Sequence, residues 1–94
     1  MAVLMQAQVL GMTEEMYAGM VGDPAFFAGL EASPGYLEFH AGGSIEGGWQ
    51  VLELWGTQAD HEAWVEKAVA PNMPEELLGG MEVTYHPIHT AKAG

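Results

Sequence analysis

The sequence predicts a small α+β domain in which an antiparallel sheet has both of its helical segments on one face. Segments with the two-residue alternation of strands and segments with helical spacing follow in the order strand, helix, strand, strand, helix, strand. Glycine and proline residues fall between these segments. A length of 94 residues is enough for one such domain. These three observations favour a two-layer architecture.

The first two elements are a strand and an interrupted helix. Residues 3–9 alternate between two unlike sets of side chains, as in a strand with two different faces. Thr13 is a suitable N-cap for the helix that follows. Gly22 and Asp23 stop or bend that helix, and the proline directly after Asp23 favours a new helical start. We therefore expect a broken helix across residues 13–31.

The next two strands form a hairpin. They are predicted at residues 36–41 and 49–55, after the turn sequence at residues 33–35. Glycine-rich residues 42–48 join them and are predicted to form a loop longer than a two-residue turn. The sequence therefore leaves the register open, and a one-residue slip would move every side chain of a strand to the other face.

A second helix and a last strand complete the chain. Thr57 begins the helix, which is predicted to end before Pro71. Residues 72–78 favour a further short helical turn. The last strand is predicted at residues 81–89, where Pro87 indicates a sheet edge or a strand end.

This order matches a ferredoxin-like βαββαβ layout that spans residues 1–94 as a single domain with a tail at 90–94. Both helices would cover one face of the sheet. The other face also carries large apolar side chains, and a chain this short has little core of its own. Two copies facing each other would bury that face, so we expect a homodimer.

The charge is strongly acidic, which excludes several classes of partner. The chain has 13 acidic residues, two lysines and no arginine, with a net charge of −11. Nucleic acids, phosphorylated cofactors and anionic lipids are bound mainly through arginine and lysine. We therefore expect no nucleic acid and no membrane as partners. The expected ligand is a small, largely apolar molecule, neutral or cationic.

The chain has no cysteine, which excludes disulfides, thiolate nucleophiles and Cys-ligated metals. Its apolar start lacks a basic flank and is interrupted by Gln6 and Gln8. This differs from both a signal peptide and a membrane span. A cytoplasmic location is therefore expected.

A set of short motifs spans nearly the whole chain. They are Gly11-Met12-Thr13, Pro34-Gly35, Phe39-His40, Gly47-Gly48-Trp49, Leu54-Trp55, a helix that ends near Pro71, and His86-Pro87-Ile88-His89. In this pattern the chain resembles small proteins of the antibiotic biosynthesis monooxygenase-like family. The resemblance implies a dimeric α+β barrel with a pocket between the sheet and the helices of each subunit.

The same resemblance implies an activity. Some proteins of this family oxidise aromatic polyketides with molecular oxygen and without a metal or flavin, others cyclise or isomerise, and others bind haem. The missing arginine departs from the haem-binding proteins, because no obvious cation is present for the propionates. The expectation is a cofactor-independent monooxygenase of secondary metabolism, with no cofactor. A cyclase or isomerase on the same scaffold and a non-catalytic binding or structural dimer are the alternatives.

His40 is the candidate catalytic residue. An imidazole titrates near neutral pH and can act as a general base on a substrate phenol, or it can be a hydrogen-bonded structural residue. Glu38 and Glu53 are unusual in otherwise apolar strands. Inside the domain, burial should raise their pKa values and make one of them an acid or base, whereas at an edge they would simply be solvated.

Aromatic side chains are the candidate binding surface. The nine aromatic residues are mostly expected in the core, with a few lining an apolar pocket. Trp55, Trp64 and Phe27 are predicted to contact the substrate where sheet and helix meet, and Tyr85 or Gln6 to orient it.

The remaining histidines are not expected to form a site. His86 and His89 lie three residues apart on a predicted strand, so they point to opposite faces and do not suit one metal ion. His61, beside Asp60 and Glu62, is expected to be solvent-exposed. No metal site is therefore predicted.

Overall fold

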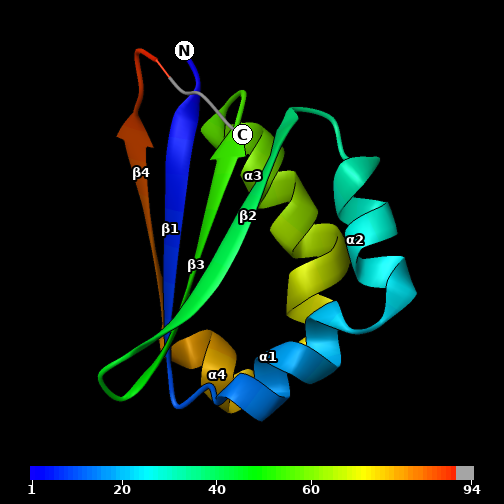
Figure 1. The fold of residues 1–94 in the computed structure, drawn as a ribbon, viewed down its shortest axis with the longest axis vertical. Coiled ribbons are helices and arrows are strands. Elements are labelled where there is room, and N and C mark those ends of the chain that lie inside the picture. Colours follow the sequence, from blue (N-terminus) through cyan, green and yellow to red (C-terminus); the bar gives the residue numbers. More distant parts are fainter. Residues whose placement is uncertain (91–94) are drawn as a thin grey trace.

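The structure, a computed structural model, describes residues 1–90 and has an α+β architecture with a four-stranded antiparallel sheet. The sheet order is β2-β3-β1-β4, which is compatible with a ferredoxin-like fold. Within the described residues, all helices lie on one face of the sheet (Figure 1). None of the described helices covers the opposite face, which is here called the open face. The strands are β1 (Val3–Leu10), β2 (Tyr36–Ile45), β3 (Gly48–Trp55) and β4 (Met81–Pro87).

The broken first helix is confirmed as α1 (Glu14–Val21) and α2 (Pro24–Glu31). The Thr13 hydroxyl accepts a hydrogen bond from a backbone N–H in the first turn of α1 at 3.2 Å. The Asp23 carboxylate does the same for α2 at 3.0 Å, directly before the proline. Each cap satisfies a backbone donor that has no partner inside its helix.

The second helical segment is longer than predicted. It consists of α3 (Gln58–Trp64), a π-helical turn η1 (Val65–Val69) and a 3₁₀ turn η2 (Ala70–Asn72), followed by α4 (Glu75–Gly79). The prediction that the helix ends before Pro71 is wrong. Proline lacks a backbone N–H, but the N–H groups in the first turn of a helical segment have no partner within that segment. Pro71 therefore fits into the 3₁₀ turn η2. Among the described residues, no helix is long and apolar enough to cross a membrane.

The hairpin turn is much tighter than predicted. Strands β2 and β3 extend to Ile45 and Gly48, so only two residues form the turn, and the predicted loop over residues 42–48 is wrong. Gly47 has a φ of 79°, a conformation that favours glycine. The other glycines of this stretch, Gly42, Gly43 and Gly48, lie inside strands.

The register, which the sequence left open, is set by the two-residue turn. From Ile45 opposite Gly48 the pairing runs without interruption to His40 opposite Glu53. These two residues are therefore direct cross-strand neighbours, whose side chains share a face. Beyond His40 the register shifts, because Tyr36 is paired with Trp55, so four steps along β2 match two steps along β3. Glu38 lies in this bulge with a φ of 56°, in the left-handed region.

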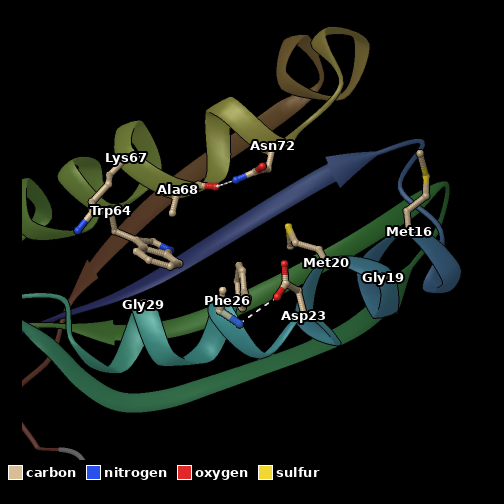
Figure 2. A pocket seen from close by; sticks show the side chains of 11 residues that line it. Met16, Gly19, Met20, Asp23, Phe26, Gly29, Trp64, Lys67, Ala68 and Asn72 are labelled. Atoms are coloured by element: carbon tan, nitrogen blue, oxygen red, sulfur yellow. Dashed lines mark hydrogen bonds between the residues drawn. The ribbon is translucent and has the colours of Figure 1, made fainter.

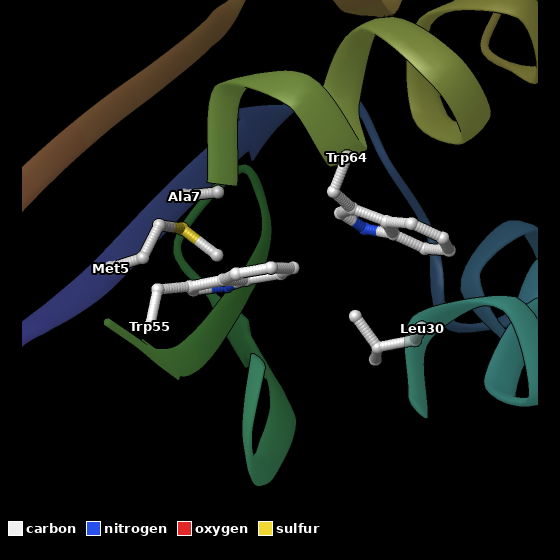
Figure 3. Packing of buried hydrophobic residues seen from close by; sticks show 5 residues of the cluster. All are labelled: Met5, Ala7, Leu30, Trp55 and Trp64. Atoms are coloured by element: carbon white, nitrogen blue, oxygen red, sulfur yellow. The ribbon is translucent and has the colours of Figure 1, made fainter. Parts of the chain in front are cut away.

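The core lies between this face of the sheet and the helices. Side chains from the central strands meet side chains from α2 and α3 there, and Trp55 and Leu30 are fully buried. Figure 3 shows Met5, Ala7 and Trp55 of the sheet facing Trp64 and Leu30. A second cluster, around Val9, Met12, Trp49 and Leu77, closes the other end.

The last strand ends at Pro87, at the edge of the sheet, as the proline indicated. It is two residues shorter than predicted. Apart from Thr90, the predicted tail at 90–94 lies outside the described residues.

Candidate active site

A buried carboxylate occupies the centre of the helix-facing side of the sheet. Glu53 on β3 is only 2% exposed. Its Oε1 accepts a hydrogen bond from Trp55 Nε1 at 3.0 Å, two residues along the same strand and therefore on the same face. Its Oε2 lies 2.6 Å from His40 Nδ1. Both oxygens thus have N–H partners although the chain has no arginine.

His40 faces the helices and not the open face. Its Nε2 lies 2.6 Å from the hydroxyl of Tyr17 on α1. The Phe27 ring contacts the imidazole edge to face, with the ring centres 5.2 Å apart, and Phe26 does so at 6.1 Å. Tyr17, His40 and Glu53 form a continuous hydrogen-bonded unit, here called the triad.

The geometry assigns the protons of the triad. Burial, with a smaller contribution from the negative charge of Glu53, raises the pKa of Tyr17. The phenol therefore keeps its proton and donates it to His40 Nε2, while His40 Nδ1–H donates to Glu53. A carboxylate that fixes an imidazole in this tautomer, with Nε2 as the acceptor, is the arrangement of a general base.

His61 is buried, at 3% exposure, so the prediction that it is solvent-exposed is wrong. Its Nδ1 lies 2.7 Å from the Tyr85 hydroxyl, and its Nε2 lies 4.0 Å from Glu53 Oε1. Burial lowers the pKa of His61 despite the opposing charges of Glu53 and Glu62. The imidazole is therefore neutral at pH 7, and a second histidine faces the same carboxylate.

Two spaces of very different size lie among the helices, and only the smaller one is lined by members of the triad. A cavity of about 50 Å³, here called the inner cavity, lies under the helices and is lined by His40, Glu53 and His61 among mostly apolar side chains. A groove of about 550 Å³ runs between the α1–α2 pair and the α3–η2 segment. Met20, Phe26 and Trp64 line both spaces, so they form the partition between them. Figure 2 shows Trp64, Phe26 and Met20 between the two helical walls.

The structure brings most of the sequence-predicted residues together. Glu53 is hydrogen-bonded to His40 and to Trp55, the Phe27 ring contacts His40, and Trp64 lines both spaces. Tyr85 joins them through His61. The two other predicted residues, Gln6 and Glu38, lie apart from this group.

Gln6 and Glu38 are not part of this arrangement. Gln6 lies on the open face, where its side-chain amide donates to Gln50 at 3.3 Å. It therefore cannot orient a substrate at His40 in the same chain. Glu38 is exposed on the bulge, so of the two alternatives for the strand carboxylates, Glu38 is solvated and Glu53 is inside.

Two members of the site were missed from the sequence. Tyr17 is one of the nine aromatic residues and follows the helical spacing, but nothing in the sequence pairs it with His40. His61 had a usable signal, because it precedes the inward-facing Trp64 by three residues and thus shares its helix face. Its acidic neighbours obscured that spacing.

Within residues 1–90, no group of three or more His, Asp or Glu side chains is arranged to hold a metal ion. No protein-family model matches the chain, and no curated protein matches it. The chemistry of the site is therefore inferred from its own geometry.

Two tyrosines make stability sensitive to alkaline pH. Burial is the main cause that raises the pKa values of Tyr36 and Tyr85 to about 12, from about 10 in an unfolded chain. Their contribution to stability is complete below pH 10 and is lost as pH rises from about 10 to about 12. We expect the melting temperature to fall across this window, and the fall to be smaller in Tyr85→Phe. A melting temperature independent of pH in this range would contradict the assignment.

Proposed function

We propose that the protein is a small-molecule enzyme in which the triad removes a proton from an apolar aromatic or polyketide-like substrate, as the first step of a cofactor-independent monooxygenation. The observation that carries this proposal is the pair of 2.6 Å contacts that place His40 between Tyr17 and buried Glu53. Membership of the antibiotic biosynthesis monooxygenase-like family and a cytoplasmic location are parts of the same proposal. The sheet order and the position of the groove support the family.

Each residue of the triad has a distinct role. Tyr17 is half-buried and stands between Met16 and Met20, which line the groove, so we assign it the contact with the substrate. It accepts the substrate proton as its own proton passes to His40 Nε2, because its raised pKa disfavours a free phenolate. Glu53 holds the imidazole in the accepting tautomer and stabilises the imidazolium that forms.

The substrate anion then supplies the electrons that reduce dioxygen. For a CH₂ group between aromatic rings, one oxygen atom enters the new carbonyl, and the other leaves as water with the two hydrogens of the CH₂ group. Carbon is oxidised and oxygen is reduced within one balanced reaction, so no external reductant takes part.

The groove is the proposed substrate site. Its volume of about 550 Å³ is within the usual range of small-molecule pockets, about 300–1,000 Å³. Met16 and Met20, which line it, flank Tyr17 on α1. Trp64 and Phe26 offer aromatic surfaces for a flat ligand.

Two measurements on a hydroxylated anthrone, which has phenols and an activated CH₂ group, test the proposal. Under nitrogen in D₂O, the protein should accelerate exchange of the CH₂ hydrogens. In air it should accelerate oxygen uptake and formation of the quinone. His40→Gln and Tyr17→Phe should abolish both accelerations, whereas His89→Gln, a matched variant at an exposed position beyond the last strand, should retain them. Equal rates in His40→Gln and the unmodified protein would overturn the proposal.

The alternatives give different results in the same assays. A cyclase or isomerase would catalyse hydrogen exchange without oxygen uptake. A non-catalytic binding or structural dimer would do neither. One observation favours the non-catalytic dimer: every hydrogen bond of the triad is already satisfied inside the protein.

We also propose that the open face forms a homodimer. Leu4, Ala41, Leu52 and Leu54 lie on it, since each alternates with a residue that faces the helices. Light scattering should therefore give twice the chain mass of 10.1 kDa. A charge at its centre, in Leu52→Glu, should produce a monomer, whereas the same charge on exposed Ala28 of α2 should not. A monomeric unmodified protein at micromolar concentration would contradict this interface.

A further inference from the structure

The inner cavity is distinct from the groove in both size and lining. At about 50 Å³ it is far too small for a polycyclic substrate, although it adjoins the catalytic histidine. Thirteen of its 16 lining residues are apolar, and the three polar ones are His40, Glu53 and His61. The apolar residues include five of the seven methionines of the chain: Met5, Met12, Met20, Met73 and Met81.

Water is a poor occupant for this space. A buried water makes about three hydrogen bonds with otherwise unsatisfied groups. Here both nitrogens of His40 and both oxygens of Glu53 already have partners, and His61 Nδ1 is paired with Tyr85. His61 Nε2 makes no hydrogen bond within residues 1–90 and lies 4.0 Å from Glu53 Oε1, and the indole N–H of Trp64 is the other side-chain nitrogen among the lining residues for which the described residues provide no partner.

A small apolar molecule suits the cavity better. Apolar cavities in proteins stay dry and accept xenon or similar guests, because such guests need no hydrogen bonds and gain dispersion contacts. A volume of about 50 Å³ accommodates a diatomic gas. The shared partition of Met20, Phe26 and Trp64 would keep that guest one layer of side chains from the groove.

We propose that the inner cavity is a binding site for dioxygen, separate from the groove that holds the organic substrate. That the bound dioxygen serves as the second substrate of the reaction rests on the proposed function, whereas the binding of dioxygen in the cavity does not. The gas is held beside His40, so it is present when the substrate anion forms. The partition has to open only by side-chain rotation of Met20 or Phe26 for the two substrates to meet.

The test uses the paramagnetism of dioxygen and the methionine methyl groups as reporters. In protein labelled with ¹³C at these methyls, relaxation is compared under nitrogen and under pressurised oxygen. Dioxygen in bulk solvent relaxes exposed methyls most, so Met1, at 88% exposure, and Met16, at 42%, are internal references. We expect a severalfold larger enhancement at Met5 and Met12, which are only 2% and 6% exposed. Xenon, a diamagnetic competitor, should reduce that excess.

Filling the cavity provides the matched variant. Ala7→Val adds two methyl groups to a strand residue that lines the cavity, whereas Ala41→Val adds the same groups on the open face. The excess at Met5 should disappear in the first variant and persist in the second. Val83→Ile serves the same purpose if Ala7→Val does not fold.

Two outcomes would overturn the gas site: relaxation that simply follows exposure, or a long-lived water detected by Overhauser contacts with His61. Neither outcome affects anaerobic hydrogen exchange, which depends on the triad alone. Conversely, if dioxygen binds in the cavity but the protein does not accelerate hydrogen exchange, the proposed gas site stands and the proposed enzymatic function is refuted. The two proposals therefore fail separately.

Discussion

Replacing Gly42 by alanine is expected to separate Tyr17 from His40 and so to disconnect the triad. A Cβ atom on Gly42 would lie 2.6 Å from both Cζ and Oη of Tyr17 and 3.0 Å from Nε1 of Trp49. Neither ring can remain in place at such distances, and overpacking of this kind costs about 1–3 kcal/mol. Denaturant unfolding should show that loss, and anaerobic hydrogen exchange on the anthrone should fall toward the rate of Tyr17→Phe.

The adjacent residue provides the control. A Cβ atom on Gly43 would meet nothing within 4 Å, and Gly43 lies on the same strand but on the opposite face. Gly43→Ala should therefore leave exchange unchanged and keep or slightly raise stability, because alanine has fewer unfolded conformations. If both alanine variants behave alike, the close approach of Tyr17 to β2 has no functional role.

Glu53→Ala and Glu53→Gln are expected to separate the structural role of this carboxylate from its chemical role. Alanine leaves Trp55 Nε1 and His40 Nδ1 without an acceptor inside the core, and each buried donor left unpaired costs about 1–3 kcal/mol. Glutamine keeps the shape. Its carbonyl oxygen accepts from Trp55, and its amide donates to His40 Nδ1.

The glutamine variant therefore reverses the tautomer of His40, because Nδ1 becomes an acceptor and the proton moves to Nε2. Nitrogen-15 spectra of the imidazole should report this change in a protein that is still folded. In a protease triad the equivalent change lowers the rate about 10⁴-fold, and we expect a loss of that order in hydrogen exchange. Glu53→Gln with full exchange activity would show that the tautomer is unimportant.

The layout of the fold could be predicted from sequence because it depends on local patterns. Alternation, helix caps and the positions of proline define the strands and the broken helix without knowledge of tertiary contacts. The glycines at residues 42–43 were misread as a loop for the opposite reason. Gly42 is required by the ring of Tyr17, which is 25 residues away in the sequence, and no local pattern reports that contact.

The site was only partly predictable for a similar reason. His40, Glu53 and Trp55 stood out because polar and aromatic residues are conspicuous on a short hairpin. Their alignment required the register, which is set by a two-residue turn inside a stretch whose glycines favour a longer loop. Tyr17 and His61 arrive from helices, and the face that each presents depends on how those helices pack. Sequence therefore identified the candidates, and tertiary structure selected among them.

The two-residue turn also makes the adjoining part of β2 unusually sensitive to length. Because β2 lies at the edge of the sheet and pairs only with β3, a change in its register leaves the rest of the sheet intact. With the turn kept, deleting a single residue between His40 and Ile45 would bring His40 opposite Leu52 and rotate the imidazole to the open face, away from Glu53. Such a deletion variant would retain its fold but lose the hydrogen bond that prepares His40 as a base. A change of one residue in length at this place would therefore remove the proposed activity without removing the fold.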